Sequence, residues 1–137
     1  MRLATATLVL VTLAGIAAGV GAQQAAPAPF KRTVLQQSDI SVPGREAVTA
    51  LAEFQPNAAS GRHTHPGEEI GYVLEGTFLI EQDGKPAVTV NAGQTFLIPS
   101  GAIHNATNKT SQIGKVVATY VVEKGKPLAT PAPAAAK

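Results

Sequence analysis

The chain has 137 residues, of which 45% are hydrophobic, a length that fits one domain and a composition that argues against wholesale disorder. The formal net charge is +2, and the eleven basic residues are scattered, so no basic stripe for binding nucleic acid is present. No cysteine occurs, which excludes disulfides, thiolate metal ligands and a cysteine nucleophile.

The first 22 residues have the layout of a secretory signal peptide. Arg2 gives a positive start, an uncharged apolar stretch spans residues 3–20, and the small residues Gly21 and Ala22 form the end that a signal peptidase reads. We therefore expect cleavage after Ala22 and an exported protein, periplasmic or secreted, with no stable membrane association afterwards. A retained anchor is the alternative, because the stretch approaches the ~20 residues that span a bilayer.

Two segments rich in proline and alanine flank the predicted domain. Residues 23–29 (QQAAPAP) and 126–137 (KPLATPAPAAAK) lack apolar periodicity. We expect them to be a flexible leader and a flexible tail. The folded domain is then predicted to cover residues 30–125.

Short apolar runs between proline and glycine turns predict an all-β domain with minimal helix. The predicted strands, in chain order, lie at residues 33–35, 47–54, 62–65, 70–82, 87–90, 95–98, 103–106 and 113–122. Gly76 predicts a bend within the longest run, and Asp83-Gly84 is the strongest hairpin signal in the chain. Strands at this spacing indicate a sandwich or barrel.

The three histidines of the chain fall in two of these segments. His63 and His65 are spaced i, i+2, which places both imidazoles on one face of a strand. Glu69 follows closely, and His104 lies downstream after a Pro-Ser-Gly turn. Three imidazoles and one carboxylate suit a single divalent transition metal, namely Mn, Fe, Co, Ni, Cu or Zn.

These segments resemble the two motifs of the cupin superfamily. Residues 57–76 (NAASGRHTHPGEEIGYVLEG) are similar to the motif G-x5-H-x-H-x3-4-E-x6-G, with Asn57 in place of the opening glycine. Asparagine can also adopt the left-handed conformation. Residues 93–108 (GQTFLIPSGAIHNATN) are similar to G-x5-P-x-G-x2-H-x3-N at every position. The resemblance implies a single-domain cupin, that is, a double-stranded β-helix or jelly-roll barrel of six to eight strands. It also implies metal ligands at His63, His65, Glu69 and His104.

Other residues near the motifs have simpler interpretations. Glu69 is a candidate for moving a proton as well as a ligand, whereas Glu68 is a weak candidate acid or base because an exposed turn is its expected place. Arg45 is expected on the surface, and Arg62 is expected to point away from the ligands. Apolar residues are expected to wall the site: Tyr72, Leu74, Phe78, Phe96 and Ile98, or their alternate neighbours.

The resemblance to small quercetin dioxygenase-like cupins favours a metal-dependent dioxygenase acting on an enol or aromatic small molecule. Two alternatives stay open, because the fold does not decide the reaction. One is a non-redox isomerase, epimerase or lyase that uses the ion as a Lewis acid on a sugar acid or small carboxylate. The other is a non-catalytic ligand-binding cupin. The resemblance also implies a homodimer formed through a sheet edge, for which residues 30–35 are the predicted segment.

Overall fold

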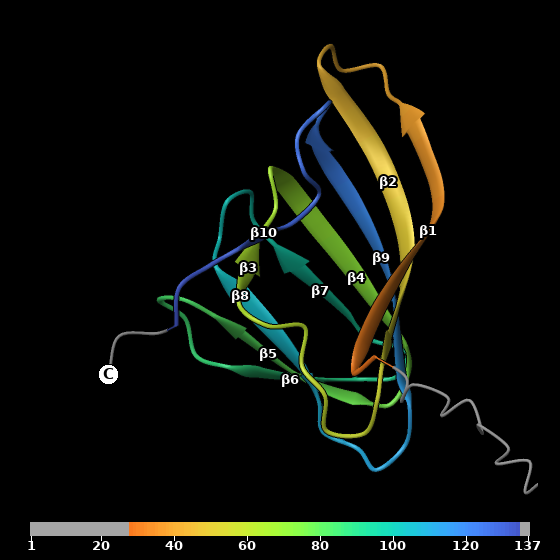
Figure 1. The fold of residues 1–137 in the computed structure, drawn as a ribbon, viewed down its shortest axis with the longest axis vertical. Coiled ribbons are helices and arrows are strands. Elements are labelled where there is room, and N and C mark those ends of the chain that lie inside the picture. Colours follow the sequence, from red (N-terminus) through yellow and green to blue (C-terminus); the bar gives the residue numbers. More distant parts are fainter. Residues whose placement is uncertain (1–27, 135–137) are drawn as a thin grey trace, which may run out of the picture.

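The computed structural model describes residues 28–134, which form two antiparallel five-stranded sheets (Figure 1). The strands are β1 (Phe30–Asp39), β2 (Arg45–Phe54), β3 (His63–Thr64), β4 (Gly67–Glu75), β5 (Thr77–Gln82), β6 (Val88–Asn91), β7 (Thr95–Ile98), β8 (His104–Asn108), β9 (Gly114–Glu123) and β10 (Thr130–Pro131). In the described part of the chain no helix is long and apolar enough to cross a membrane. The predicted signal peptide, residues 1–22, and most of the predicted leader lie outside the described residues.

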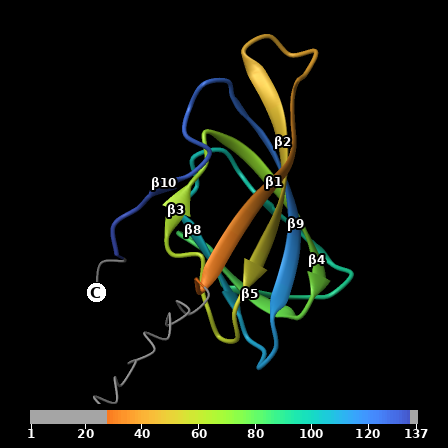
Figure 2. The same ribbon diagram turned by 45° about the vertical axis from the view of Figure 1, so that its right-hand side comes forward.

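The two sheets enclose the interior of a single barrel. Sheet A has the order β1-β2-β9-β4-β7 and sheet B the order β10-β3-β8-β5-β6. Figure 2 brings β1 forward at the edge of sheet A, with the strands of sheet B behind it. This arrangement confirms the predicted all-β, double-stranded β-helix class, with ten strands in the described residues where six to eight were expected.

The core lies between the sheets and is built by strict alternation along the long strands of sheet A. Strands β2 and β9 pair over ten residues, and every second residue of each strand is buried. The ring of Phe54 packs between those of Phe30 and Phe78, with centroid distances of 4.7 and 4.9 Å. Burying one such aromatic side chain contributes about 1.5–3 kcal/mol to folding.

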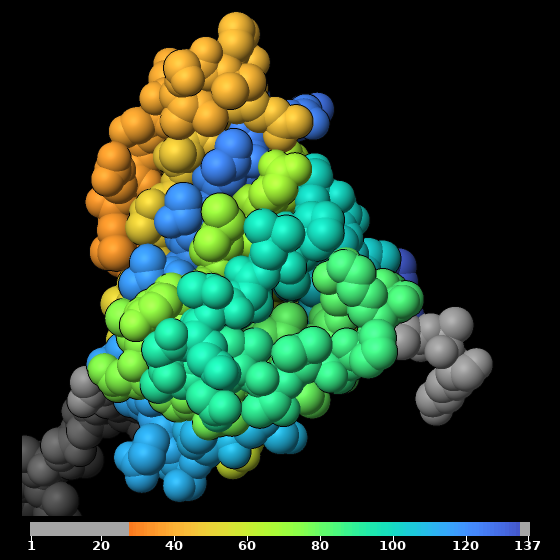
Figure 3. Space-filling view, turned by 180° about the vertical axis from the view of Figure 1, so that it is seen from behind, coloured from red at the N-terminus to blue at the C-terminus, as the bar shows by residue number. Residues whose placement is uncertain are grey.

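The outer face of sheet A carries apolar side chains that are exposed to solvent. Figure 3 shows this face, with the strands running in order from β1 (orange) to β7 (teal). Tyr72 and Leu74 lie on it and are each 44% exposed, so their prediction as walls of the site is wrong. Because Glu69 faces inward, the period of two along β4 turns Val73 inward and Tyr72 outward. The predicted wall residues Phe78 and Ile98 do lie in the buried core.

Two backbone predictions from the motifs are confirmed. Asn57, at the position of the missing motif glycine, has φ of 58° and is the non-glycine residue with positive φ among the described residues. Gly76 has φ of 93° and separates β4 from β5, so the long predicted strand bends there.

The structure corrects the predicted C-terminal boundary of the domain, which was placed at residue 125. Thr130 and Pro131 form β10, which pairs with Thr64 and His63 of β3. The backbone N–H of Ala132 also donates to the carbonyl of residue 62 at 2.9 Å. The sequence showed no apolar periodicity here because the segment is held by backbone hydrogen bonds and by one apolar side chain, Leu128, that packs against the core. The barrel therefore extends well into the predicted tail.

Candidate metal centre

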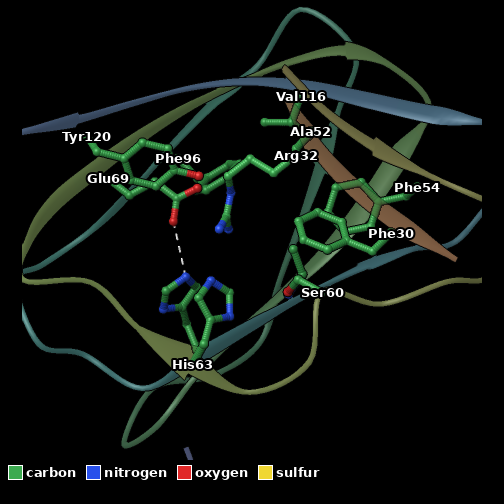
Figure 4. Close-up of a pocket in the computed structure, with 12 residues that line it drawn as sticks. Phe30, Arg32, Ala52, Phe54, Ser60, His63, Glu69, Phe96, Val116 and Tyr120 are labelled. Carbon is green, nitrogen blue, oxygen red and sulfur yellow. Dashed lines mark hydrogen bonds and ion pairs between the residues drawn. The ribbon is translucent and has the colours of Figure 1, made fainter. Parts of the chain in front are cut away.

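Both sheets contribute to a buried cluster of four side chains. His63 belongs to β3, His65 follows that strand, His104 begins β8, and Glu69 reaches in from β4 of sheet A. One potential ligand atom from each residue lies within 4.8 Å of all the others. Figure 4 shows the carboxylate of Glu69 pointing from sheet A toward the imidazoles near His63. The structure thus brings together the four predicted ligands from segments far apart in the sequence.

Backbone carbonyls fix the orientation of all three imidazoles. Each ring faces a carbonyl oxygen with its Nδ1 atom: His63 faces Gly61 at 2.8 Å, His104 faces Ala102 at 3.0 Å, and His65 faces Leu128. Because a carbonyl can only accept a hydrogen bond, Nδ1 of each ring carries the proton. Each Nε2 atom then presents a lone pair, as metal-ligating histidines do.

In the tautomers that bind a metal, with the proton on Nδ1 of each ring, the lone pairs of the cluster converge on one point. The Nε2 atoms of His65 and His104 lie 3.0 and 3.1 Å from the same atom, Oε2 of Glu69. The buried Nε2 of His65 has no hydrogen-bond partner among the described residues. Crowded, buried acceptors of this kind are costly unless a proton or a cation lies among them. A divalent metal ion satisfies all of them at once, so the residues fit such an ion.

The electrostatics of the cluster favour the protonation states that a metal needs. Burial lowers the pKa of the His63 imidazole to about 4. Burial alone would raise the pKa of the Glu69 carboxyl, but in the metal-free cluster hydrogen bonds from the imidazoles of His104 and His65 outweigh it and lower the pKa to about 2. At neutral pH His63 is therefore neutral and Glu69 is ionised, which are the forms that bind metal.

Two cavities that share lining residues border the cluster. The inner cavity, of about 20 Å³, borders His63, Glu69 and His104 and is walled mainly by apolar and aromatic side chains. This volume is close to that needed for a single water molecule, ~10–15 Å³. The outer cavity has a volume of about 280 Å³. Phe30, Arg32, Ser60 and His63 line both cavities. The inner space admits a group of a few atoms, and the outer space admits the rest of a small molecule.

Three charged residues considered from the sequence do not line the inner cavity. Glu68 is exposed on the other face of β4. Arg45 donates from Nη1 to the carbonyl of Pro66 at 3.2 Å. Arg62 points away from the ligands, as predicted, and pairs with both carboxylate oxygens of Asp83 at 2.8 and 2.7 Å.

Sequence reasoning missed Arg32 and expected Tyr120 to be a core or wall residue, which its burial confirms. The guanidinium carbon of Arg32 lies 5.5 Å from the ring centroid of Tyr120 and 5.3 Å from that of Phe30. The Tyr120 ring is 4.6 Å from that of His65, and burial, followed by the nearby Glu69 carboxylate, raises the pKa of the Tyr120 hydroxyl. Tyr120 therefore keeps its proton. One sequence pattern could have indicated that Arg32 faces the cavity. Arg32 stands two residues after the aromatic Phe30, so the two side chains lie on the same face of the strand.

The chain matches one protein-family model and is similar to parts of several curated proteins. A family model described as "Cupin domain" matches residues 50–123. The HTH-type transcriptional regulator PuuR of Escherichia coli (strain K12) is 33% identical over 79 residues, which are 57% of this chain and 42% of that protein. Oxalate oxidase 2 of Hordeum vulgare is 30% identical over 118 residues, covering 68% of this chain and 51% of that one. The chain thus spans about half the length of these curated relatives or less.

A solved structure supports the fold alone. It is an uncharacterised conserved protein with a double-stranded β-helix domain from Klebsiella pneumoniae, with a TM-score of 0.62 at 17% sequence identity. The match covers 78% of this chain and 90% of that one.

Proposed function

Because the chain belongs to the cupin family, we propose that it is a metal-dependent enzyme whose ion is held by His63, His65, Glu69 and His104. One observation carries the proposal: four buried ligand atoms lie within 4.8 Å of one another beside a cavity that continues to the surface. The lone pairs of the metal-binding tautomers converge at this point, and the cavities beside it give room for a small molecule.

Within this class, the reaction that we propose is the oxidation by O₂ of a small enol or aromatic molecule, the dioxygenase-like activity expected from the motifs. Three imidazoles and one carboxylate suit redox-active ions such as Fe, Mn, Co, Ni and Cu. Such an ion, when bound, supplies Lewis acidity and a route for electrons. One relative is named an oxalate oxidase, which supports oxidative chemistry at a site of this kind.

The residues of the chain have distinct parts in such a reaction. Glu69 balances the charge of the ion, and its Oε2 atom is the candidate to accept a proton from the substrate. Tyr120, which stays protonated, lies against His65 and holds that ring in place. The apolar walls, including Phe54 and Phe96, exclude water from the reacting atoms.

A non-redox reaction is the second candidate. The inner cavity of about 20 Å³ leaves little room for an aromatic ring beside the ligands. A small carboxylate or sugar acid, polarised by a Lewis-acid ion, fits this space better than a flavonol. Isomerisation, epimerisation or lyase chemistry would need no O₂.

The test combines elemental analysis with an oxygen electrode. Protein purified from its own compartment is expected to carry about one transition-metal ion per chain, because the cluster holds four ligands around one point. It should then consume O₂ with a catechol, a flavonol or a small enolisable acid. Loss of both metal and O₂ uptake in His104→Ala, with both retained in Glu68→Ala, supports the dioxygenase-like reaction. Full turnover of the Zn-loaded protein without O₂ would favour the Lewis-acid reaction.

We also propose that the protein is exported and forms a homodimer. Export rests on the pattern of residues 1–22 and predicts a mature N-terminus at Gln23, which mass spectrometry of the exported protein can check. Dimerisation rests on β1, the edge strand of sheet A, where Val34 and Leu35 are 51% and 58% exposed. Analytical ultracentrifugation should find a dimer that Leu35→Lys converts to a monomer; a monomeric wild type would contradict it.

A further inference from the structure

Arg32 brings a cationic side chain to the cavities without an acidic partner among the described residues. Its Nε atom is buried and has no hydrogen-bond partner there. Arg62, which also borders the outer cavity, is occupied by contrast: its nitrogens bind both oxygens of Asp83 and the carbonyl of Pro133. A buried donor on a charged group is costly when unpaired. Arg32 therefore retains donor capacity that a ligand can use.

Arg32 is placed so that its free hydrogen-bond donors can reach a molecule that approaches the cluster. Arg32 is paired with Ala52 across the β1–β2 ladder, and Ala52 is buried, so both face inward. Figure 4 shows the guanidinium group directed into the pocket, toward the side where His63 and Glu69 lie. Because Arg32 lines both cavities, a molecule bound in either one lies beside it.

Two aromatic rings hold the guanidinium group in a defined place. Its central carbon lies 5.3 Å from the ring centroid of Phe30 and 5.5 Å from that of Tyr120. Contacts of this kind favour a cation through the ring quadrupole and limit its rotation. A guanidinium group held in this way offers a planar fork of donors, which matches the two oxygens of a carboxylate.

We propose that Arg32 is the residue that binds the carboxylate of the substrate, and that the substrate is accordingly a small carboxylate with a second oxygen that reaches the metal ligands. The inference rests on the proposed function and narrows its substrate from enols and aromatics to enolisable or hydroxylated carboxylates. The volumes agree, since the inner cavity accepts a group of a few atoms and the outer one the remainder. A phosphate also matches the fork of Arg32, so inorganic phosphate serves as the competing probe in the test.

Calorimetric titration of the Mn²⁺-loaded, full-length protein tests this with two matched probes. Glycolate carries a carboxylate, whereas ethylene glycol has the same carbon skeleton without charge. The matched variants are Arg32→Gln and Lys31→Gln, because Lys31 is exposed and its neighbouring position on β1 points to the other face. Both variants lose one positive charge on the same strand. Elemental analysis should find equal metal in all three proteins.

The expected result is a glycolate affinity that is about 10- to 100-fold weaker in Arg32→Gln, the loss expected for charge-assisted hydrogen bonds. Lys31→Gln should stay within about twofold of the wild type, since its charge is exposed and screened. Ethylene glycol should bind equally weakly to all three. Equal glycolate affinity in Arg32→Gln and Lys31→Gln would overturn the proposal. So would tighter binding of inorganic phosphate than of glycolate, or no measurable binding of glycolate, oxalate or pyruvate by the wild type.

Two further readouts keep the result unambiguous. Arg32→Lys retains the charge but loses the fork, so its glycolate affinity should fall between those of the wild type and Arg32→Gln, and a thermal melt checks that each variant folds. A wild type that binds glycolate through Arg32 but turns over no carboxylate would leave this assignment intact while refuting the proposed enzyme. Turnover of a carboxylate that is unchanged in Arg32→Gln would refute the assignment alone.

Discussion

The two sheets of the barrel differ in construction, and the candidate metal centre lies where they meet. In sheet A, β2 and β9 pair along their full ten residues, and the buried apolar core follows their alternation. In sheet B, β3 and β10 have two residues each, and β3 pairs with β8 through His63 and His104. The three imidazoles come from the sheet with the shorter strands, and Glu69 comes from the other.

Because of this difference, we expect the stability of the fold to depend mainly on sheet A and the geometry of the imidazoles to depend mainly on sheet B. Sheet A stabilises the barrel through burial, which is roughly proportional to apolar area. The imidazoles of sheet B depend instead on single backbone carbonyls, including that of Leu128 in the C-terminal segment. Changes at the two places should therefore have different consequences, and the following experiments test that separation.

Removal of a ligand from either sheet should have the largest effect. His104→Ala (sheet B) and Glu69→Ala (sheet A) should each weaken metal binding by more than about 100-fold, above the loss typical of outer supporting residues. Competition with a chelator measures the affinity, and circular dichroism should show an unchanged β spectrum. Glu68→Ala is the matched control, because Glu68 is the exposed neighbour. Full metal content in His104→Ala would show that the site is wrongly assigned.

Acid should destabilise the metal-free protein through His63 of sheet B. Its pKa falls from 6.5 to about 4 on folding, chiefly through burial. Because the unfolded chain binds this proton more tightly, the contribution of His63 to stability is complete above about pH 6.5, falls as the pH drops, and is lost below about pH 4. The loss should amount to about 3 kcal/mol. Urea titrations at several pH values should show a shallower dependence for His63→Asn, and identical slopes would contradict the burial effect.

Truncation of the C-terminal segment should weaken the site more than the fold. A chain that ends after Lys126 lacks the carbonyl of Leu128 and the strand β10, which support His65 and His63. We expect metal affinity to fall by about 10- to 100-fold, as for other supporting groups of metal ligands. A chain that ends after Ala134 is the control and should bind metal normally. If both truncations bind metal equally well, the segment does not position the histidines.

A core substitution in sheet A should have the smallest effect. It should lower the stability of the fold and leave metal binding nearly unchanged. Val48→Ala removes two methyl groups from a side chain that is 4% exposed and that lines neither cavity beside the ligands. The free energy of unfolding should fall by about 1.5 kcal/mol, from ~0.8 kcal/mol per buried group. Metal affinity should remain within twofold of the wild type. A parallel loss of metal affinity would show that the two sheets do not act separately.

Much of the site was predictable because its main features are local. The i, i+2 spacing places His63 and His65 on one face, and the turn chemistry of Asn57 and Gly76 follows from single residues. The same period of two, counted from an inward Glu69, would also have excluded Tyr72 as a wall. The prediction left strand parity open by allowing the alternate neighbours, and the structure turns Val73 inward instead.

The sequence by itself predicted the all-β class and, through the motif resemblance, the four candidate ligand positions, because alternation and motif spacing are properties of short stretches of chain. Only the tertiary structure decided that Arg32 faces the cavities and that the carbonyl of Leu128, 63 residues from His65, orients its imidazole. Both depend on which strands pair and in what register. Every residue offers similar backbone hydrogen-bonding groups, so many strand pairings between distant segments compete. No short stretch of sequence therefore encodes which strands pair or in what register.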